Sequence, residues 1–275
     1  MGRYRLTARL GEGGMGTVYL GVSPGARRVA VKVVREELAQ DPSFRRRFAR
    51  EVDAVRRVGG FHTAPVVDAG TDDARPWLVT EYIPGPSLHE VLRSHGALPA
   101  TTVRTLALGL AEALEGIHAC GIIHRDLKPS NVVVSDAGPR VIDFGIARAA
   151  DGTALTRTDF VVGTRGFLAP EQLTGGPLTP AVDAYAFGMV LCHAGGAAPF
   201  PEGTVLEEAL RTLPADLSAV VGDCLRQDPA GRPTPAEILQ RLSRSGEKAP
   251  GDWLPGAVRT LVARHQAATV PAPGA

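Results

Sequence analysis

Cysteine and aromatic residues are scarce in this chain of 275 residues. There are three cysteines, Cys120, Cys192 and Cys224, and aromatic residues make up 5% of the sequence. The cysteines are isolated and lack metal-ligand spacing, so we interpret them as buried, reduced thiols rather than as a redox site. The chain also lacks a run of 18 apolar residues and a secretory signal. We therefore expect a cytoplasmic protein with no membrane span.

An excess of charge of one sign is also missing. The chain has 30 basic residues (Lys and Arg) and 29 acidic residues (Asp and Glu), which gives a formal net charge of +1. Such a balance provides no strong field to attract a polyanion, so we expect no nucleic-acid partner. The length is sufficient for one large domain or two lobes.

Lysine is rare, because nearly all basic residues are arginine. The lysines are Lys32, Lys128 and Lys248. A compact ammonium group acts as a point charge, whereas the guanidinium group of arginine is a planar fork. A chain that otherwise uses arginine has kept lysine at two internal positions, which indicates specific roles for Lys32 and Lys128. Chance is the alternative explanation, and the motifs around both lysines argue against it.

The most informative stretch is residues 124–131, His-Arg-Asp-Leu-Lys-Pro-Ser-Asn. It places the carboxylate of Asp126, the ammonium of Lys128 and the amide of Asn131 within eight residues. Twelve residues after Asn131 comes Asp143, which begins an Asp-Phe-Gly sequence. Asp-Phe-Gly alone would mean little, but a chance match to the longer stretch is very improbable.

A glycine-rich segment, residues 11–20, separates two β-prone runs near the N-terminus. The pattern predicts strand–turn–strand, with backbone N–H groups available to phosphate oxygens. Gly-x-Gly-x-x-Gly alone is a weak signal, and a simple glycine-rich hairpin is the alternative. A dinucleotide-binding fold would need a helix next, whereas a strand is expected here.

Residues 28–34 are expected to form a third strand in which Ala30 and Lys32 share a face. The small side chain of Ala30 would make room for a nucleotide base, and Lys32 would neutralise phosphate. The alternative for Lys32 is a solvated position on an edge strand. The next segment, residues 41–58, predicts a helix with Asp41 as a candidate cap and Glu51 beside its apolar stripe. Residues 45–47, three consecutive arginines, are predicted to form its solvated face.

Further along, the pattern predicts two more strands in residues 64–83 and then a break at residues 84–86, Pro-Gly-Pro. Helical spacing follows, most clearly in 101–118 and 182–192, and short strands are expected at 132–134 and 140–142. We therefore expect a strand-rich lobe at 4–83 and a mainly helical lobe at 84–245. Residues 246–275, rich in Pro and Ala, are expected to form a loose tail with at most one short helix at 255–266.

These segments, in this order, resemble the eukaryotic-type protein kinase family over about residues 4–243. The resemblance rests on the glycine loop, the strand with Lys32, the stretch 124–131, the Asp-Phe-Gly sequence and residues 169–171, Ala-Pro-Glu. The Arg, Ala and Gly bias is similar to the bacterial, especially actinobacterial, Ser/Thr branch. The resemblance implies an α+β, bilobal fold with an antiparallel sheet and one helix in the N-lobe and a mainly α-helical C-lobe. It also implies transfer of the ATP γ-phosphate to Ser or Thr hydroxyls of protein substrates.

The resemblance also implies a role for each site residue. Asp126 would accept or orient the substrate hydroxyl proton, with Lys128 at the γ-phosphate, and Asn131 and Asp143 would bind Mg²⁺, with Mn²⁺ as the alternative. Lys32, held by Glu51, would bind the α- and β-phosphates. The implied ATP-binding residues are Leu10, Gly11, Glu12, Gly13, Gly14, Met15, Gly16, Thr17, Val18, Ala30, Lys32, Glu81, Ile83 and Val133.

Control by phosphorylation is a further implication. Arg125 precedes the proposed catalytic Asp126, and in kinases of this type that arginine pairs with a phosphate on the activation loop. Thr156 and Thr158 are the leading acceptors, because they match the double-Thr pattern of bacterial relatives. Autophosphorylation in trans would require a transient homodimer.

Two other functions are weighed against a protein kinase. A pseudokinase scaffold would keep the fold without catalysis, but Lys32, Glu51, Asp126, Asn131 and Asp143 are all present. A small-molecule phosphotransferase of similar fold usually lacks the Ala-Pro-Glu segment, which this chain has. One departure from the family pattern concerns substrates: residues 201–216 look shorter than usual, so the helix that often docks substrates is expected to be clipped.

Overall fold

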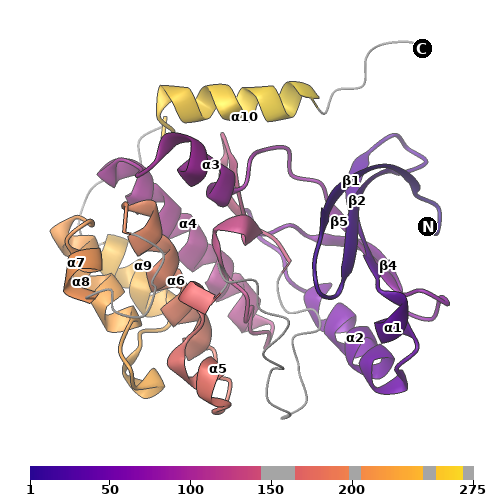
Figure 1. Ribbon diagram of the computed structural model, residues 1–275, viewed down its shortest axis with the longest axis horizontal. Coiled ribbons are helices and arrows are strands. Elements are labelled where there is room, and N and C mark those ends of the chain that lie inside the picture. The colour runs from indigo at the N-terminus through magenta and orange to yellow at the C-terminus, as the bar shows by residue number, and fades with distance from the viewer. Residues whose placement is uncertain (144–164, 198–205, 244–251, 269–275) are drawn as a thin grey trace.

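A five-stranded antiparallel sheet forms the N-terminal part of the molecule (Figure 1). The computed structural model describes residues 1–143, 165–197, 206–243 and 252–268. The strands follow the order β1-β2-β3-β5-β4, and their bounds are β1 (Arg5–Glu12), β2 (Gly16–Val22), β3 (Arg28–Val34), β4 (Val66–Gly70) and β5 (Trp77–Glu81). The two expected strands around the glycine loop are therefore β1 and β2.

β3 shows why these residues form a sheet. Its β-branched residues Val29, Val31 and Val33 are buried on one face with Tyr4, Trp77 and Val79. Ala30 and Lys32 point to the other face, where both are half-buried. Lys32 lies opposite Val18 on β2 and opposite Leu78 on β5. The alternation predicted from the sequence thus places Lys32 in a central strand rather than at an edge.

Two helices, α1 (Glu36–Ala39) and α2 (Pro42–Val55), follow β3. The carboxylate of Asp41 accepts the Ser43 backbone N–H (2.7 Å), which caps α2, and four apolar side chains of α2 are buried at helical spacing. The prediction that residues 45–47 form a solvated face is wrong for Arg45. Its guanidinium donates to the backbone carbonyl oxygens of Ala39, Thr71, Asp73 and Ala74 and so ties α2 to the loop before β5.

The C-terminal part is mainly helical. It contains α3 (Leu88–His95), α4 (Ala100–Ala119), α5 (Pro170–Thr174), α6 (Ala181–Ala194), α7 (Leu206–Leu210), α8 (Ala215–Cys224) and α9 (Pro235–Ser243). α4 packs against α6 and α9, and most residues of α4 and α6 are buried. These two helices therefore form the centre of the larger hydrophobic core.

A small hairpin carries the candidate site on this helical body. β6 (Val132–Ser135) pairs with β7 (Gly138–Val141), and β7 packs against α4. A 3₁₀ turn, η1 (Pro129–Asn131), leads into β6, and Asp143 follows β7. Because the hairpin folds back on itself, it brings Asn131 and Asp143 to the same end.

The expected loose tail is wrong for residues 252–268. They form an ordered segment that ends in α10 (Gly256–Ala268), which lies beside α3 in Figure 1. Trp253, Leu254, Val258 and Val262 are all buried in the larger core. The sequence predicted a short helix here but not its burial, because Pro, Gly and Ala dominate the flanks and hide four well-spaced apolar residues.

None of the helices in the described ranges is long and apolar enough to span a bilayer.

Candidate active site

A buried carboxylate, Asp183 on α6, holds the backbone of the stretch 124–131. Asp183 is 0% exposed, and its two oxygens accept the backbone N–H groups of His124 (2.7 Å) and Arg125 (2.8 Å). The ring Nε2 of His118 on α4 lies 2.7 Å from the same carboxylate. Charge-assisted bonds of this kind are short and directional, so Asp183 fixes the path of the loop beneath Asp126.

Two residues of the candidate site have strained backbone. Arg125 has φ of 64° and Asp143 has φ of 58°, the left-handed region that non-glycine residues rarely adopt. For Arg125, the strain is held in place by contacts on both sides: its N–H donates to Asp183, and its carbonyl oxygen accepts from the Gln172 side chain (3.1 Å). Such strain persists only where the surroundings over-determine it, and it is concentrated at functional sites.

The three polar residues singled out in the sequence lie together. The Asn131 side-chain amide donates to the Asp126 carbonyl oxygen (2.8 Å) and to its Oδ2 (3.1 Å). The ammonium of Lys128 lies 3.1 Å from the same Oδ2. Asp126 is therefore held as an oriented carboxylate beside a positive charge, which is the arrangement expected of a group that accepts or orients a proton.

His124 serves as a neutral support in this arrangement. It is buried, and its burial lowers the pKa of the imidazole. Its Nδ1 accepts the Asp126 backbone N–H (3.2 Å), so that nitrogen carries no proton. His124 thus aligns the loop rather than exchanging protons.

The lysine–glutamate pairing expected from the sequence differs in this structure. Lys32 Nζ lies 3.2 Å from Asp143 Oδ1, whereas Glu51 Oε1 lies 3.9 Å from Arg125 Nη1. Among the described residues, no ion pair joins Lys32 to Glu51. The physical reason is local: each carboxylate pairs with the cation within reach, and α2 presents Glu51 to the 124–131 stretch rather than to β3.

A tight turn closes the glycine loop between β1 and β2. Gly13 and Gly16 exchange two backbone hydrogen bonds (2.9 and 3.2 Å). A side chain at Gly16 would collide with the backbone at Val33, whereas one at Gly11, Gly13 or Gly14 would meet open space. Gly16 is thus required for packing, and the other three leave room above the loop, as close approach of a phosphate would need.

The apolar residues expected around a base come from β1 (Leu10), β3 (Ala30), β6 (Val133) and the chain just after β5 (Ile83). Ile83 and Val133 form a small buried cluster with Ala64, against which Ile142 packs. Ala30 lies opposite Leu20 in the sheet, and Leu10 on β1 is 44% exposed. The Glu81 N–H already donates to the Pro65 carbonyl oxygen (3.0 Å), so that N–H is not available to a ligand.

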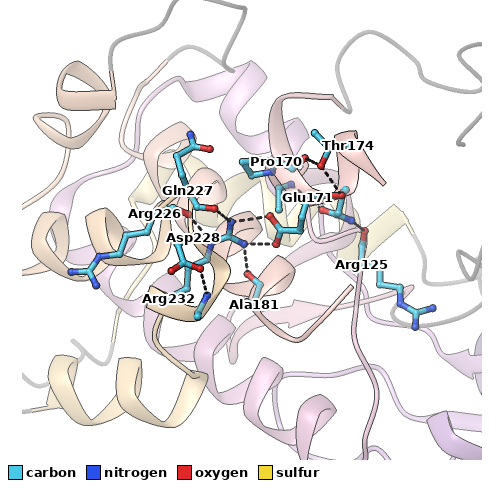
Figure 2. Close-up of polar contacts among 12 residues, drawn as sticks. Arg125, Pro170, Glu171, Thr174, Ala181, Arg226, Gln227, Asp228 and Arg232 are labelled. Carbon is cyan, nitrogen blue, oxygen red and sulfur yellow. Dashed lines mark hydrogen bonds and ion pairs between the residues drawn. The ribbon is translucent and has the colours of Figure 1, made fainter. Parts of the chain in front are cut away.

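An ion pair between Glu171 and Arg232 braces the other side of the site (Figure 2). The guanidinium binds the carboxylate in a bidentate manner, with N–O distances of 2.6 and 2.9 Å. Arg232 also donates to the carbonyl oxygens of Ala181 (3.0 Å) and Arg226 (2.8 Å), so the buried charge is well satisfied. Glu171 and Gln172 are neighbours on α5, so the brace and the contact to Arg125 come from one helix.

A basic pocket of about 310 Å³ lies between α2 and the 124–131 stretch. Its lining includes Arg47, Arg50, Glu51 and Arg125. Sequence reasoning singled out Arg125 and Glu51 but missed Arg47 and Arg50. The spacing of 47, 50 and 54 would have placed these residues on one face of a helix, close to Glu51.

The structure describes only some of the remaining residues that the sequence led us to expect at the site. The candidate phosphorylation sites Thr156 and Thr158 lie outside the described residues. Within those residues, no group of three or more His, Cys, Asp or Glu side chains could hold a metal ion. The oxygens of Asn131 and Asp143 fit a cation that takes further ligands from substrate phosphates, as Mg²⁺ does.

Comparison with known proteins identifies the family of this chain. The family model described as "Protein kinase domain" matches residues 4–242. The probable serine/threonine-protein kinase PkwA of Thermomonospora curvata is 47% identical over 95% of this chain and 36% of its own length. The serine/threonine-protein kinase AfsK of Streptomyces coelicolor is also 47% identical, over 93% of this chain and 34% of its own length. The chain thus spans about a third of these relatives.

A solved structure shows the same fold. The crystal structure of the Mycobacterium tuberculosis PknI kinase domain superposes with a TM-score of 0.69 at 29% identity, covering 88% of this chain and 96% of that one. The expected α+β, bilobal kinase fold is confirmed. Since the family model covers most of the chain, the chain belongs to the protein kinase family, in the eukaryotic-type Ser/Thr branch found in bacteria.

Proposed function

We propose that this chain, an ATP-dependent protein serine/threonine kinase by family, transfers the γ-phosphate of ATP to Ser or Thr hydroxyls with Asp126 as the proton-accepting group. The observation that carries the proposal is the placement of Asp126 between Lys128 (3.1 Å) and the Asn131 amide (3.1 Å). In the reaction, a bond forms between the substrate oxygen and the γ-phosphorus, and the bond to the β-phosphate oxygen breaks. Asp126 takes the hydroxyl proton, and Lys128 compensates the negative charge of the γ-phosphate that is transferred.

A divalent cation, for which we propose Mg²⁺ with Mn²⁺ as the alternative, would be held by Asn131 and Asp143. The cation supplies charge neutralisation on the phosphates when bound. Asn131 uses its N–H groups on Asp126, so its carbonyl oxygen is the atom that suits a cation. Lys32 already contacts Asp143, so its ammonium lies where it can bind phosphates attached to that cation.

We further propose that catalysis requires Glu51 to exchange partners. In the structure Glu51 pairs with Arg125 and Lys32 pairs with Asp143. A cation on Asp143 would compete with Lys32 for that carboxylate, and Lys32 could then pair with Glu51 as the family resemblance implies. The exchange would release Arg125 from Glu51 for a different anion.

A phosphate on the segment 144–164 is the anion we propose for Arg125. Both flanks of that segment lie at the candidate site, because Asp143 contacts Lys32 and Gln172 contacts Arg125. The basic pocket offers Arg47 and Arg50 beside Arg125. A phosphothreonine brings about −1.5 to −2 charges, which three guanidinium groups can bind. We propose Thr156 and Thr158 as the acceptors and a transient homodimer as the route to transfer in trans.

Radiolabelled ATP tests the proposed activity. The wild-type protein should label itself and a generic Ser/Thr protein substrate, whereas Lys32→Met and Asp143→Asn should lose nearly all transfer. A lack of labelling in the wild-type protein, with ATP still bound, would favour a pseudokinase. Labelling of small alcohols in preference to protein would favour a small-molecule phosphotransferase.

A double threonine variant and an arginine variant test the proposed control. The double change Thr156→Ala with Thr158→Ala should abolish the rise in rate that follows preincubation with ATP, and so should Arg125→Ala. An activation that persists unchanged in the double threonine variant would show that other residues carry the phosphate.

A further inference from the structure

Residues 252–268 lie beyond the part of the chain that the family model matches, residues 4–242, yet they are firmly packed. Trp253 and Leu254 are each 6% exposed, and Val258 and Val262 on α10 are 1% and 0% exposed. Burial of four apolar side chains stabilises the attachment of this segment to the C-lobe. The segment is therefore part of the folded body, and its contacts can fix the positions of neighbouring elements.

The first contact is made by Trp253, which links α4 to the β6–β7 hairpin. Its indole N–H donates to the Ser135 carbonyl oxygen (3.1 Å), and its own carbonyl oxygen accepts from the Thr102 hydroxyl (2.8 Å). Both bonds are buried. Ser135 ends β6, the strand that carries Val133 and begins next to Asn131. Trp253 thus fixes the turn end of the hairpin whose opposite end carries the cation ligands.

The second contact comes from the last turn of α10. Gln266 Nε2 donates to Asp136 Oδ2 (3.0 Å), and His265 Nε2 lies 3.2 Å from Glu90 Oε2 on α3. α10 therefore contacts two elements and links them: the hairpin turn at residues 135–136 and the first turn of α3. Figure 1 shows α10 lying along α3.

α3 and the β6–β7 hairpin meet beside Val133 and Ile83, two of the residues expected to bind ATP. Ser87, whose hydroxyl caps α3 by accepting the Glu90 N–H (3.2 Å), bridges to Val133 through the backbone. The Val134 N–H donates to the Pro86 carbonyl oxygen (2.9 Å), and a side chain at Gly85 would strike the Val134 carbonyl oxygen. A shift of α3 relative to the hairpin would therefore displace Val133 from residues 83–87.

We propose that the segment 252–268 is a positioning element for the nucleotide: by clamping α3 against the β6–β7 hairpin, it sets the distance between Val133 and the 83–87 connection. This inference rests on the proposed ATP site. It predicts that loosening the clamp weakens the binding of ATP more than the transfer step, because Asp183 separately holds the backbone just before Asp126, and because Asp126, Lys128 and Asn131 contact one another. The segment would thus act through the ATP-binding residues and not on the reacting atoms.

Surface variants of α10 in the full chain test the proposal. His265→Ala with Gln266→Ala removes both outer contacts without opening the core. The variant should raise KM for ATP about three- to tenfold while kcat stays within about twofold. Its melting temperature should change little, since exposed polar pairs add little stability. Arg264→Ala, an exposed neighbour on the same helix turn, is the matched control and should leave KM for ATP unchanged.

Two further variants keep the test decisive. Trp253→Phe keeps an aromatic ring but removes the N–H that reaches Ser135 and part of the buried indole, and it should also raise KM for ATP. Glu90→Ala combined with His265→Ala should raise KM for ATP no more than either change alone, because each change breaks the same contact between Glu90 and His265. An unchanged KM for ATP in all of these variants would overturn the proposal and leave α10 a purely stabilising helix. A wild-type protein that binds no ATP would instead overturn the proposed function.

Discussion

At the scale of single residues, Arg232 carries a charge that the fold must compensate. Its side chain is 0% exposed and lies against Glu171, which is 10% exposed. Removal of one partner of a buried pair leaves an uncompensated charge and costs about 3–5 kcal/mol, whereas removal of both partners costs less. We therefore expect Arg232→Met to destabilise the chain by about 3–5 kcal/mol, and Glu171→Met with Arg232→Met to recover part of the loss.

Urea denaturation of the single and double variants measures this difference. Equal unfolding free energies for the two variants would show that the Glu171 carboxylate carries no penalty once Arg232 is removed, and would contradict the expected cost of a buried charge without its partner.

The cysteines give a second prediction for single residues. Burial raises the pKa of the Cys192 thiol and of the Cys224 thiol to about 12 each, whereas Cys120 is partly exposed. Alkylation needs the thiolate, so at pH 8 iodoacetamide should label Cys120 alone in the folded protein. Labelling followed by peptide mass spectrometry measures this, and early labelling of Cys192 or Cys224 would contradict the packing of α6 and α8.

The same shift has a consequence for stability. The thiols in the unfolded chain ionise above the ordinary value of 9.0, while those in the folded chain stay protonated to about 12. Because the unfolded state then binds fewer protons than the folded state, this contribution to stability is lost as pH rises above about 9.

Single residues also show what the sequence could predict of the site. The spacing of Asp126, Lys128, Asn131 and Asp143 was sufficient to expect their clustering, which the structure shows for Asp126, Lys128 and Asn131. The pairing of Glu51 could not be predicted, because Lys32 and Arg125 are both cations and only the three-dimensional structure decides which is nearer.

At the scale of elements, α4 offers a matched pair of glycines. An alanine at Gly109 would place its Cβ 2.5 Å from Pro139 Cγ on β7, whereas at Gly116 the nearest atom is the Gly59 carbonyl oxygen at 3.4 Å. Glycine inside a helix costs about 1 kcal/mol relative to alanine, so Gly116→Ala should stabilise the chain by up to that amount. Gly109→Ala should instead destabilise it by about 1–3 kcal/mol, because the added methyl overpacks the contact with β7.

Chemical denaturation of both variants in parallel provides the measurement. A gain in stability for Gly109→Ala would mean that α4 and β7 do not pack as closely as the structure shows.

Elements also mark the limits of prediction from the sequence. β3 and the apolar stripe of α2 follow from alternation and helical spacing, and both lie where they were expected. The burial of α10 could not be predicted, because Val258 and Val262 form too narrow a stripe to identify the surface that receives them. The role of Arg45 was missed for a similar reason: the carbonyl groups that it binds belong to residues 26 to 29 positions away and to Ala39.

At the scale of the whole molecule, two of the ion pairs at the site join separate parts of the fold. Lys32 on β3 contacts Asp143 after β7, and Glu51 on α2 contacts Arg125 in the 124–131 stretch. Both pairs connect the sheet and α2 to the helical body. A change of partner by Glu51 would therefore alter the contact between α2 and the helical body. For this reason we propose that activity is controlled at the basic pocket.

Asp126→Asn tests the proposed role of Asp126 as the proton-accepting group. The change keeps the shape of the side chain and removes its ability to take a proton, so kcat for phosphate transfer should fall by about 10²–10⁴-fold. The dissociation constant for ATP, measured by calorimetry with the same protein, should stay within about twofold, because Lys32 and Asp143 are untouched. A kcat close to that of the wild-type protein, with intact ATP binding, would contradict the role given to Asp126 and with it the account of the site.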